Sequence, residues 1–373
     1  MIKRLKKVKK VRELVHDSVA EKAAALNPLS NKPEEMPSLE NVPRITNETI
    51  TEHREEVLSG ARKYIYPLQH SKHRIVVVTF SIVIAAILSL MVYCSAALYK
   101  YYQYNTFLYR ITQVMPFPVA KTGSSFVDYE NYLFELRHYV HYYQTQQGQN
   151  FTGTGRDQLI KFRKQALQDV INYSYIKKLA QQNNISVSDK EVDSRINEVR
   201  DQNRLGSDNK VFADVLRDYW GWSIDDFKRS LKEEILSEKV TAKLDTKTTG
   251  KANAVLAQLK TGADFSALAK QYSADQAAQS NGGDYGFSIT KTNPNVPPEV
   301  IDTLFGLKAG QYSGVILASP VLANAGPTLE IVKLIQNTNG TVTAQHISFS
   351  LENINDSINK LKAQQPVHNF VKF

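Results

Sequence analysis

The sequence predicts an α+β protein with a single transmembrane helix, a mostly helical domain and a smaller mixed domain. An uncharged apolar run at residues 75–98 predicts the transmembrane helix. Apolar residues then recur at three- and four-residue steps from about residue 157 to 240, as expected of amphipathic helices. After residue 280, a glycine-rich turn and short β-patterned segments predict a sheet with flanking helices.

Residues 75–98 are long enough to cross the hydrocarbon core of a bilayer as one helix. The main alternative is a cleaved signal peptide, but 74 residues precede the run, whereas signal peptides lie near the N-terminus. We therefore expect a single-pass cell-membrane protein that contacts membrane lipid through this run.

The basic residues around this run indicate its orientation. Lys63, Lys72 and Arg74 precede it. Lys100 and Arg110 are the basic residues close after it. The positive-inside rule therefore predicts a cytoplasmic N-terminus and extracytoplasmic C-terminal domains.

Residues 1–73 are polar and contain several spaced prolines, so we expect a largely disordered, basic cytoplasmic tail. Its densest basic run, Lys3 to Arg12, fits an anionic membrane surface better than a nucleic-acid groove. We therefore expect no nucleic-acid partner, although the chain carries a net charge of +9. Cys94 is the sole cysteine of the sequence, which excludes an intramolecular disulfide.

Residues 105–245 are expected to form the helical domain. Ser188 with Glu191, and Ser223 with Asp226, have the spacing of capping boxes that start helices. The region contains PFPVAKTGSSFVDYENYLFEL, QALQDVINYSYIKKLAQQNNISVSDKEVDSRINEVR and YWGWSIDDFKRSLKEEILSEKV. In that order, these stretches resemble the N-terminal domain of SurA- and PrsA-type foldases. The resemblance implies a helical chaperone domain with no chemistry of its own.

Residues 246–373 are expected to form the mixed domain. They contain the fragments TGADFSALAKQYS, NGGDYGF and LFGLKAGQYS, which resemble the parvulin (PpiC-type) rotamase family in order and spacing. The resemblance implies a four-stranded antiparallel sheet with flanking helices and peptidyl-prolyl isomerase activity on unfolded or newly exported polypeptides with X-Pro bonds. Rotation about an X-Pro bond needs no nucleophile, so no cofactor is expected.

The resemblance also implies the residues of the site. Asp275 falls at the family's acidic or cysteine position, and Glu330 falls at the histidine position of the last strand. His346 completes the candidate catalytic set. Tyr285, Val296 and Val300 would form the proline-pocket wall, where the two valines are smaller than is usual in the family, and Phe287 would lie beside the pocket.

His346 is in an unexpected part of the chain. The family signature of the first strand, small-x-His-Ile, is absent just before residue 251 and appears instead at Ala344–Ile347, after the last strand. Because the first and last strands of the parvulin fold are antiparallel neighbours, residues 342–350 are predicted to fill the first strand's place, as in a circularly permuted domain. The alternative is the truncated start of a second copy.

The sequence therefore predicts a membrane-anchored prolyl isomerase and chaperone. The alternatives are a non-catalytic holdase or binding module that uses a degenerate parvulin fold, and a structural subunit that uses the fold for docking. His138 and His141 share a helix face at a metal-binding spacing. No Cys or acidic residue is placed to complete that site, so no metal is expected.

Overall fold

The computed structural model describes residues 46–65, 68–203, 205–206, 208–321 and 325–373. Most of the predicted tail, residues 1–45, thus lies outside the described residues. The chain divides into two compact units, Met1–Ala86 and Ile87–Phe373.

The described part of the predicted tail contains a helix, α2 (Asn47–Ile65), where we expected disorder. At its start, the backbone N–H groups of Thr46 and Thr49 each donate a hydrogen bond to the other residue's hydroxyl, which caps the helix. No proline occurs in the sequence between Pro43 and Pro67, so nothing interrupts the helix.

Helix α3 (Leu68–Ser95) contains most of the predicted apolar run and continues into the π-helical turn η2 (Ala96–Lys100). By length and composition, Arg74–Lys100 is suited to cross a membrane. The side chains of residues 74–89 are exposed all around the helix, as expected of a segment whose apolar surface faces lipid.

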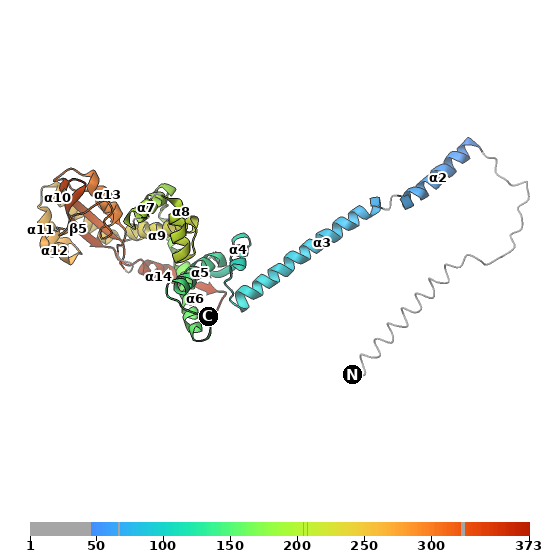
Figure 1. The fold of residues 1–373 in the computed structure, drawn as a ribbon, viewed down its shortest axis with the longest axis horizontal. Helices are drawn as coiled ribbons and strands as arrows, with labels where there is room; N and C mark the ends of the chain where they lie inside the picture. The colour runs from blue at the N-terminus through green and yellow to red at the C-terminus, as the bar shows by residue number, and fades with distance from the viewer. Residues whose placement is uncertain (1–45, 66–67, 204, 207, 322–324) are drawn as a thin grey trace, which may run out of the picture. The chain divides into compact units, whose positions relative to one another are not determined.

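The helical domain combines long helices with a small sheet (Figure 1). Both predicted capping boxes are present, since the Ser188 and Ser223 hydroxyls accept hydrogen bonds from the N–H groups of Glu191 and Asp226. Its elements are α4 (Thr106–Val114), β1 (Pro118–Thr122), β2 (Ser125–Asp128), α5 (Tyr129–Thr145), η3 (Gly153–Gly155), α6 (Arg156–Gln182), α7 (Asp189–Gln202), α8 (Asn209–Trp220) and α9 (Ile224–Leu244).

The end of the apolar helix is part of the core of this domain. Cys94 and Leu98 have no exposed surface and pack with the domain's buried aromatic side chains. The Tyr129 hydroxyl donates a hydrogen bond to the Leu98 carbonyl over 2.8 Å.

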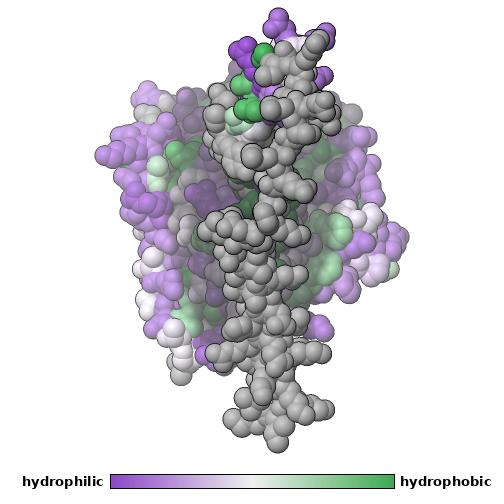
Figure 2. Space-filling view, turned by 90° about the vertical axis from the view of Figure 1, so that its right-hand side faces the viewer, coloured by the Kyte–Doolittle hydropathy of each residue, from purple (hydrophilic) through white to green (hydrophobic). Residues whose placement is uncertain are grey.

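On the face shown in Figure 2, residues that are not grey are mostly hydrophilic, with hydrophobic ones in separate small patches.

The mixed domain is built on a three-stranded antiparallel sheet of order β3-β4-β5 within the described chain. Residues 284–289 add isolated bridges on the outer side of β5, at Asp284 with Gln345 and at Ile289 with Val342. They replace the regular fourth strand that we expected. The elements are α10 (Thr246–Lys260), α11 (Phe265–Tyr272), α12 (Gln276–Asn281), α13 (Pro298–Gly306), β3 (Ile316–Ala318), β4 (Thr328–Thr338) and β5 (Thr341–Ser350).

Residues 342–350 belong to β5, which pairs with β4. The two strands form an antiparallel hairpin in which Val332 faces His346. Its turn contains Asn339 and Gly340, both with positive φ, as a tight hairpin turn requires.

Helices cover both faces of the sheet. Successive side chains of a strand point to opposite faces, and each face of this sheet carries an apolar cluster that a helix buries. Leu329, Ile331, Ile347 and Phe349 pack with residues of α10 and α11. Val332, Leu334, Val342 and Ala344 pack with residues of α13.

The C-terminal segment packs with the helical domain, whereas we expected it to belong to the mixed domain of residues 246–373. Helix α14 (Asn355–Gln364) contributes buried residues to the helical domain's core, and β6 (Val367–Asn369) pairs with β1. The Phe373 ring stacks on the Tyr132 ring at 5.6 Å. Strand β6 pairs with the edge of β1 that β2 leaves open, and Val371 after it is buried.

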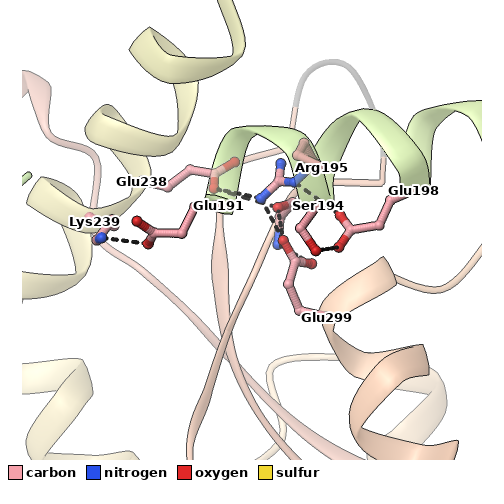
Figure 3. A network of polar contacts seen from close by, with 8 residues as sticks. Glu191, Ser194, Arg195, Glu198, Glu238, Lys239 and Glu299 are labelled. Atoms are coloured by element: carbon pink, nitrogen blue, oxygen red, sulfur yellow. Dashed lines mark hydrogen bonds and ion pairs between the residues drawn. The ribbon is translucent and has the colours of Figure 1, made fainter. Parts of the chain in front are cut away.

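Arg195 joins the two domains (Figure 3). The guanidinium of this α7 residue pairs with Glu198 on the same helix, with Glu238 on α9 and with Glu299 on α13. The Ser319 hydroxyl donates a second hydrogen bond to Glu299. The junction thus places three carboxylates around one guanidinium, and the Arg195 side chain is only 11% exposed.

The excess of carboxylates makes this junction sensitive to pH. Burial, together with Glu299, raises the pKa of Glu198 to about 7. Burial is also the main cause that raises the pKa of Glu238 to about 7, although Arg195 opposes it. A carboxyl whose pKa is raised by folding contributes most to stability below its unfolded pKa, and this contribution is lost as the pH rises to about 7.

We expect Glu238→Gln to raise the thermal stability of the full chain at pH 8 but not at pH 5. Glutamine mimics the protonated carboxyl, so at pH 8 it removes a cost of about 1–3 kcal/mol. Differential scanning calorimetry in detergent at both pH values measures the effect. The matched control is Glu191→Gln, since a hydrogen bond from Lys239 lowers the pKa of Glu191 to about 2 and leaves it ionised throughout this range. A Glu238→Gln chain with the same pH dependence as the wild type would contradict the prediction.

Candidate functional site

The candidate site is centred on His346, which lies on β5 between two carboxylates. Its Nδ1 lies 3.1 Å from Glu330 Oε2, and its Nε2 lies 3.2 Å from Asp275 Oδ2. The imidazole is 9% exposed, the Glu330 side chain 7% and the Asp275 side chain 41%. The structure therefore brings the three predicted catalytic residues together, with Asp275 on the solvent side.

Strand pairing accounts for the position of Glu330. Val332 and His346 are directly opposite each other on β4 and β5, so their side chains share a face of the sheet. Glu330 is two residues before Val332 on the same face, which makes it a diagonal neighbour of His346. Its second oxygen accepts a hydrogen bond of 3.0 Å from the Thr328 hydroxyl, which fixes the carboxylate.

The start of α12 holds Asp275. One carboxylate oxygen accepts a hydrogen bond of 2.8 Å from the Ala277 N–H as the helix cap, which leaves the other for His346. The preceding loop is tied to β5, because the Ser273 hydroxyl accepts a hydrogen bond of 3.1 Å from the Ser348 N–H. The Asp275 carboxylate is therefore fixed although it is partly exposed.

Tyr285 covers the imidazole. Its ring stacks on the His346 ring with 4.1 Å between centroids and 15° between planes. Burial, with smaller contributions from Glu330 and Asp275, raises the pKa of Tyr285 well above its ordinary value. The phenol therefore stays protonated at neutral pH and can donate a hydrogen bond.

Gly283 is required for the close approach of this turn to β5. The His346 N–H donates a hydrogen bond of 2.8 Å to the Gly283 carbonyl. Gly283 has a φ of +91°, and an added Cβ would lie 2.8 Å from the His346 carbonyl oxygen. A larger residue would displace the turn and with it Tyr285.

The four predicted pocket residues have different environments. Tyr285 is half-buried and Phe287 is 43% exposed, with their rings 5.7 Å apart. Val296 and Val300 have no exposed surface and pack against the sheet with α13, so the expectation that they line an open wall is not met. Their small apolar side chains fit the core beneath the site instead.

Sequence reasoning missed the residues that support the site. Thr328 supports the site by its hydrogen bond to the Glu330 carboxylate, and Ser273 supports it by holding the loop before Asp275 against β5. The positions of these two residues depend on strand alternation and on the path of a loop, and neither produces a motif that can be recognised in the sequence.

Comparisons with known proteins agree with this architecture. Residues 69–241 match the SurA-like N-terminal domain family. Residues 230–319 match the PPIC-type PPIASE domain family. The chain thus contains one region similar to SurA-like N-terminal domains and a second region similar to PPIC-type domains.

Among curated proteins, the chain is 47% identical to the periplasmic chaperone PpiD of Escherichia coli over 77 residues, which are 20% of this chain and 12% of PpiD. It is 31% identical over 153 residues to the foldase protein PrsA of Caldanaerobacter subterraneus, covering 36% of this chain and 46% of PrsA. It is 26% identical over 173 residues to the putative peptidyl-prolyl cis-trans isomerase YacD of Bacillus subtilis, covering 41% of this chain and 58% of YacD. The matches thus span less than two thirds of each relative. At the family level they support a prolyl isomerase and chaperone role.

We expect His346→Ala to destabilise the mixed domain by about 1–3 kcal/mol, because it leaves one oxygen of the buried Glu330 carboxyl group without its hydrogen-bond partner. Hydrogen exchange of the β4 and β5 amides measures the effect. His368→Ala is the matched control, since His368 is exposed, and it should change exchange by less than about 0.5 kcal/mol. Equal effects of the two substitutions would show that the contact between His346 and Glu330 is not needed for the fold.

Proposed function

We propose that this protein is a membrane-anchored peptidyl-prolyl cis-trans isomerase and chaperone that assists the folding of exported proteins. The observation that carries the proposal is the position of His346, fixed between Glu330 and Asp275 beneath Tyr285 in a parvulin-type domain. Its clients would be unfolded or newly exported polypeptides with X-Pro bonds.

The proposed mechanism is binding of the twisted amide. Amide resonance sets the rotation barrier of about 18–20 kcal/mol, and a site lowers it by binding the less conjugated, twisted state more tightly than the planar one. In this proposal the polar edge formed by Asp275 and His346 contacts the amide, while Tyr285 and Phe287 contact the proline ring. Glu330, at the position where the family has a histidine, orients His346 from the buried side.

We also infer that the parvulin domain is circularly permuted, with β5 in the place of the family's first strand. In support of this, β5 lies between β4 and residues 284–289, and it carries the Ala344–Ile347 signature. His346 on β5 then reaches Asp275 as a first-strand histidine would.

The membrane anchor is α3 in this proposal. It is supported by the length and composition of Arg74–Lys100 and by the basic residues that precede it. The N-terminus would be cytoplasmic and both domains extracytoplasmic.

A second candidate function is a non-catalytic holdase. The burial of Val296 and Val300 favours it, because these residues offer no surface to a proline ring. The helical domain also has a cavity of about 560 Å³ whose lining includes Trp222 and His138. The two rings stack at 4.3 Å, and burial lowers the pKa of His138 to about 4, so its ring adds a neutral aromatic surface at pH 7.

We expect the full chain in detergent micelles to show isomerase activity in a protease-coupled assay, and Asp275→Asn to reduce it by about tenfold to a thousandfold. Asparagine caps helices as well as aspartate does, so this change removes the charge but keeps α12. The full chain is needed because Cys94 and Leu98 belong to the core of the helical domain.

Asp264→Asn is the matched control for this assay, since Asp264 caps the neighbouring helix α11 in the same way. It should leave turnover unchanged. A wild-type chain that suppresses aggregation of an unfolded client but has no isomerase activity would favour the holdase.

We expect a reporter enzyme that is active only outside the cytoplasm to be active when fused through a flexible linker after Phe373. The reason is the excess of basic residues before α3. The same reporter fused before Met1 should be inactive. The reverse pattern would overturn the proposed orientation.

A further inference from the structure

The helical domain begins where the apolar helix leaves the bilayer. About 20 residues cross the hydrocarbon core, so a span that starts near Ile75 ends near Cys94. Cys94 and Leu98 are fully buried in the core of the helical domain. No flexible linker therefore separates the end of the span from this domain.

The first helix after the span has an exposed face of unusual composition. On α4, Phe107 is 52% exposed and Val114 is 84% exposed, and the exposed Arg110 lies between them. The three positions are three and four residues apart, which places them on one face of the helix. The opposite face holds the buried Leu108, so α4 is anchored in the domain while two apolar side chains face outward.

Helix α4 is also close to the end of the span. The five residues 101–105 separate Lys100 from α4 and reach at most about 20 Å. This connection is held in place, because Arg137 Nη1 donates a hydrogen bond of 3.0 Å to the Tyr104 carbonyl. Tyr101 in the same connection is 61% exposed.

We propose that Phe107, Arg110 and Val114 of α4, together with Tyr101, lie in the headgroup region of the extracytoplasmic leaflet and bind phospholipid. This inference rests on the proposed membrane anchor. The transfer of apolar side chains of an interfacial helix from water to the acyl boundary is favourable, and an arginine between them can pair with lipid phosphates. A tyrosine fits the same layer because its ring is apolar and its hydroxyl polar. The contact fixes the helical domain against the membrane surface.

The experiment uses the full chain reconstituted in vesicles of phosphatidylcholine and phosphatidylglycerol. Phe107→Cys and Val114→Cys are each labelled with a bimane maleimide, and the wild type gives the background because Cys94 is buried. Val211→Cys near the start of α8 is the matched control, since Val211 is 46% exposed and is not among the residues proposed to contact lipid.

Brominated phosphatidylcholine should quench the labels at positions 107 and 114 at least about threefold more than the label at 211, and iodide in the buffer should do the reverse. Equal quenching at the three positions, in chains that float with the vesicles and resist carbonate extraction, would overturn the lipid contact and leave the anchor intact. Chains that carbonate extracts would overturn the anchor and, with it, this inference.

Discussion

The antiparallel pairing of β4 with β5 is the interaction on which the mixed domain depends. One face of this hairpin provides Leu329 and Ile347 to the cluster under α10 and α11, and the other provides Val332 and Ala344 to the cluster under α13. The same register makes Glu330 and His346 diagonal neighbours. A shift of β5 by one residue against β4 would turn His346 to the face opposite to Glu330 and the apolar β5 side chains to the wrong clusters, so core and site depend on the same register.

Local patterns in the sequence were sufficient to predict much of this arrangement. The Ser188 and Ser223 caps could be recognised because a capping box needs only residues three apart. The β5 strand and the position of His346 could be predicted because an Asn-Gly turn fixes a hairpin locally. The structure also confirms the proximity of Asp275 to His346, although the roles of both remain predictions.

Other features depend on long-range packing that no local pattern encodes. The return of β6 to β1 joins residues more than 240 positions apart, and nothing in the short sequence around Val367 identifies its partner strand. Likewise, Val296 matches an expected pocket position, but its burial depends on how closely α13 approaches the sheet. The junction at Arg195 also combines charges from three helices that are far apart in sequence.

The path of the chain gives the two domains different mechanical roles. The helical domain holds both the end of the apolar helix, through Leu98, and the C-terminal Phe373, through Tyr132. The mixed domain is therefore an insertion that leaves the helical domain after α9 and returns to it at α14. Because the mixed domain is connected to the helical domain at both ends, the candidate site can move only a limited distance from the helical domain. The Arg195 junction restricts this movement further. Because the network is polar and carries an excess of carboxylates, it ties the domains less firmly at neutral pH than an apolar interface would. The arrangement thus keeps the candidate site close to the helical domain, while the polar junction still allows the two domains to shift against each other.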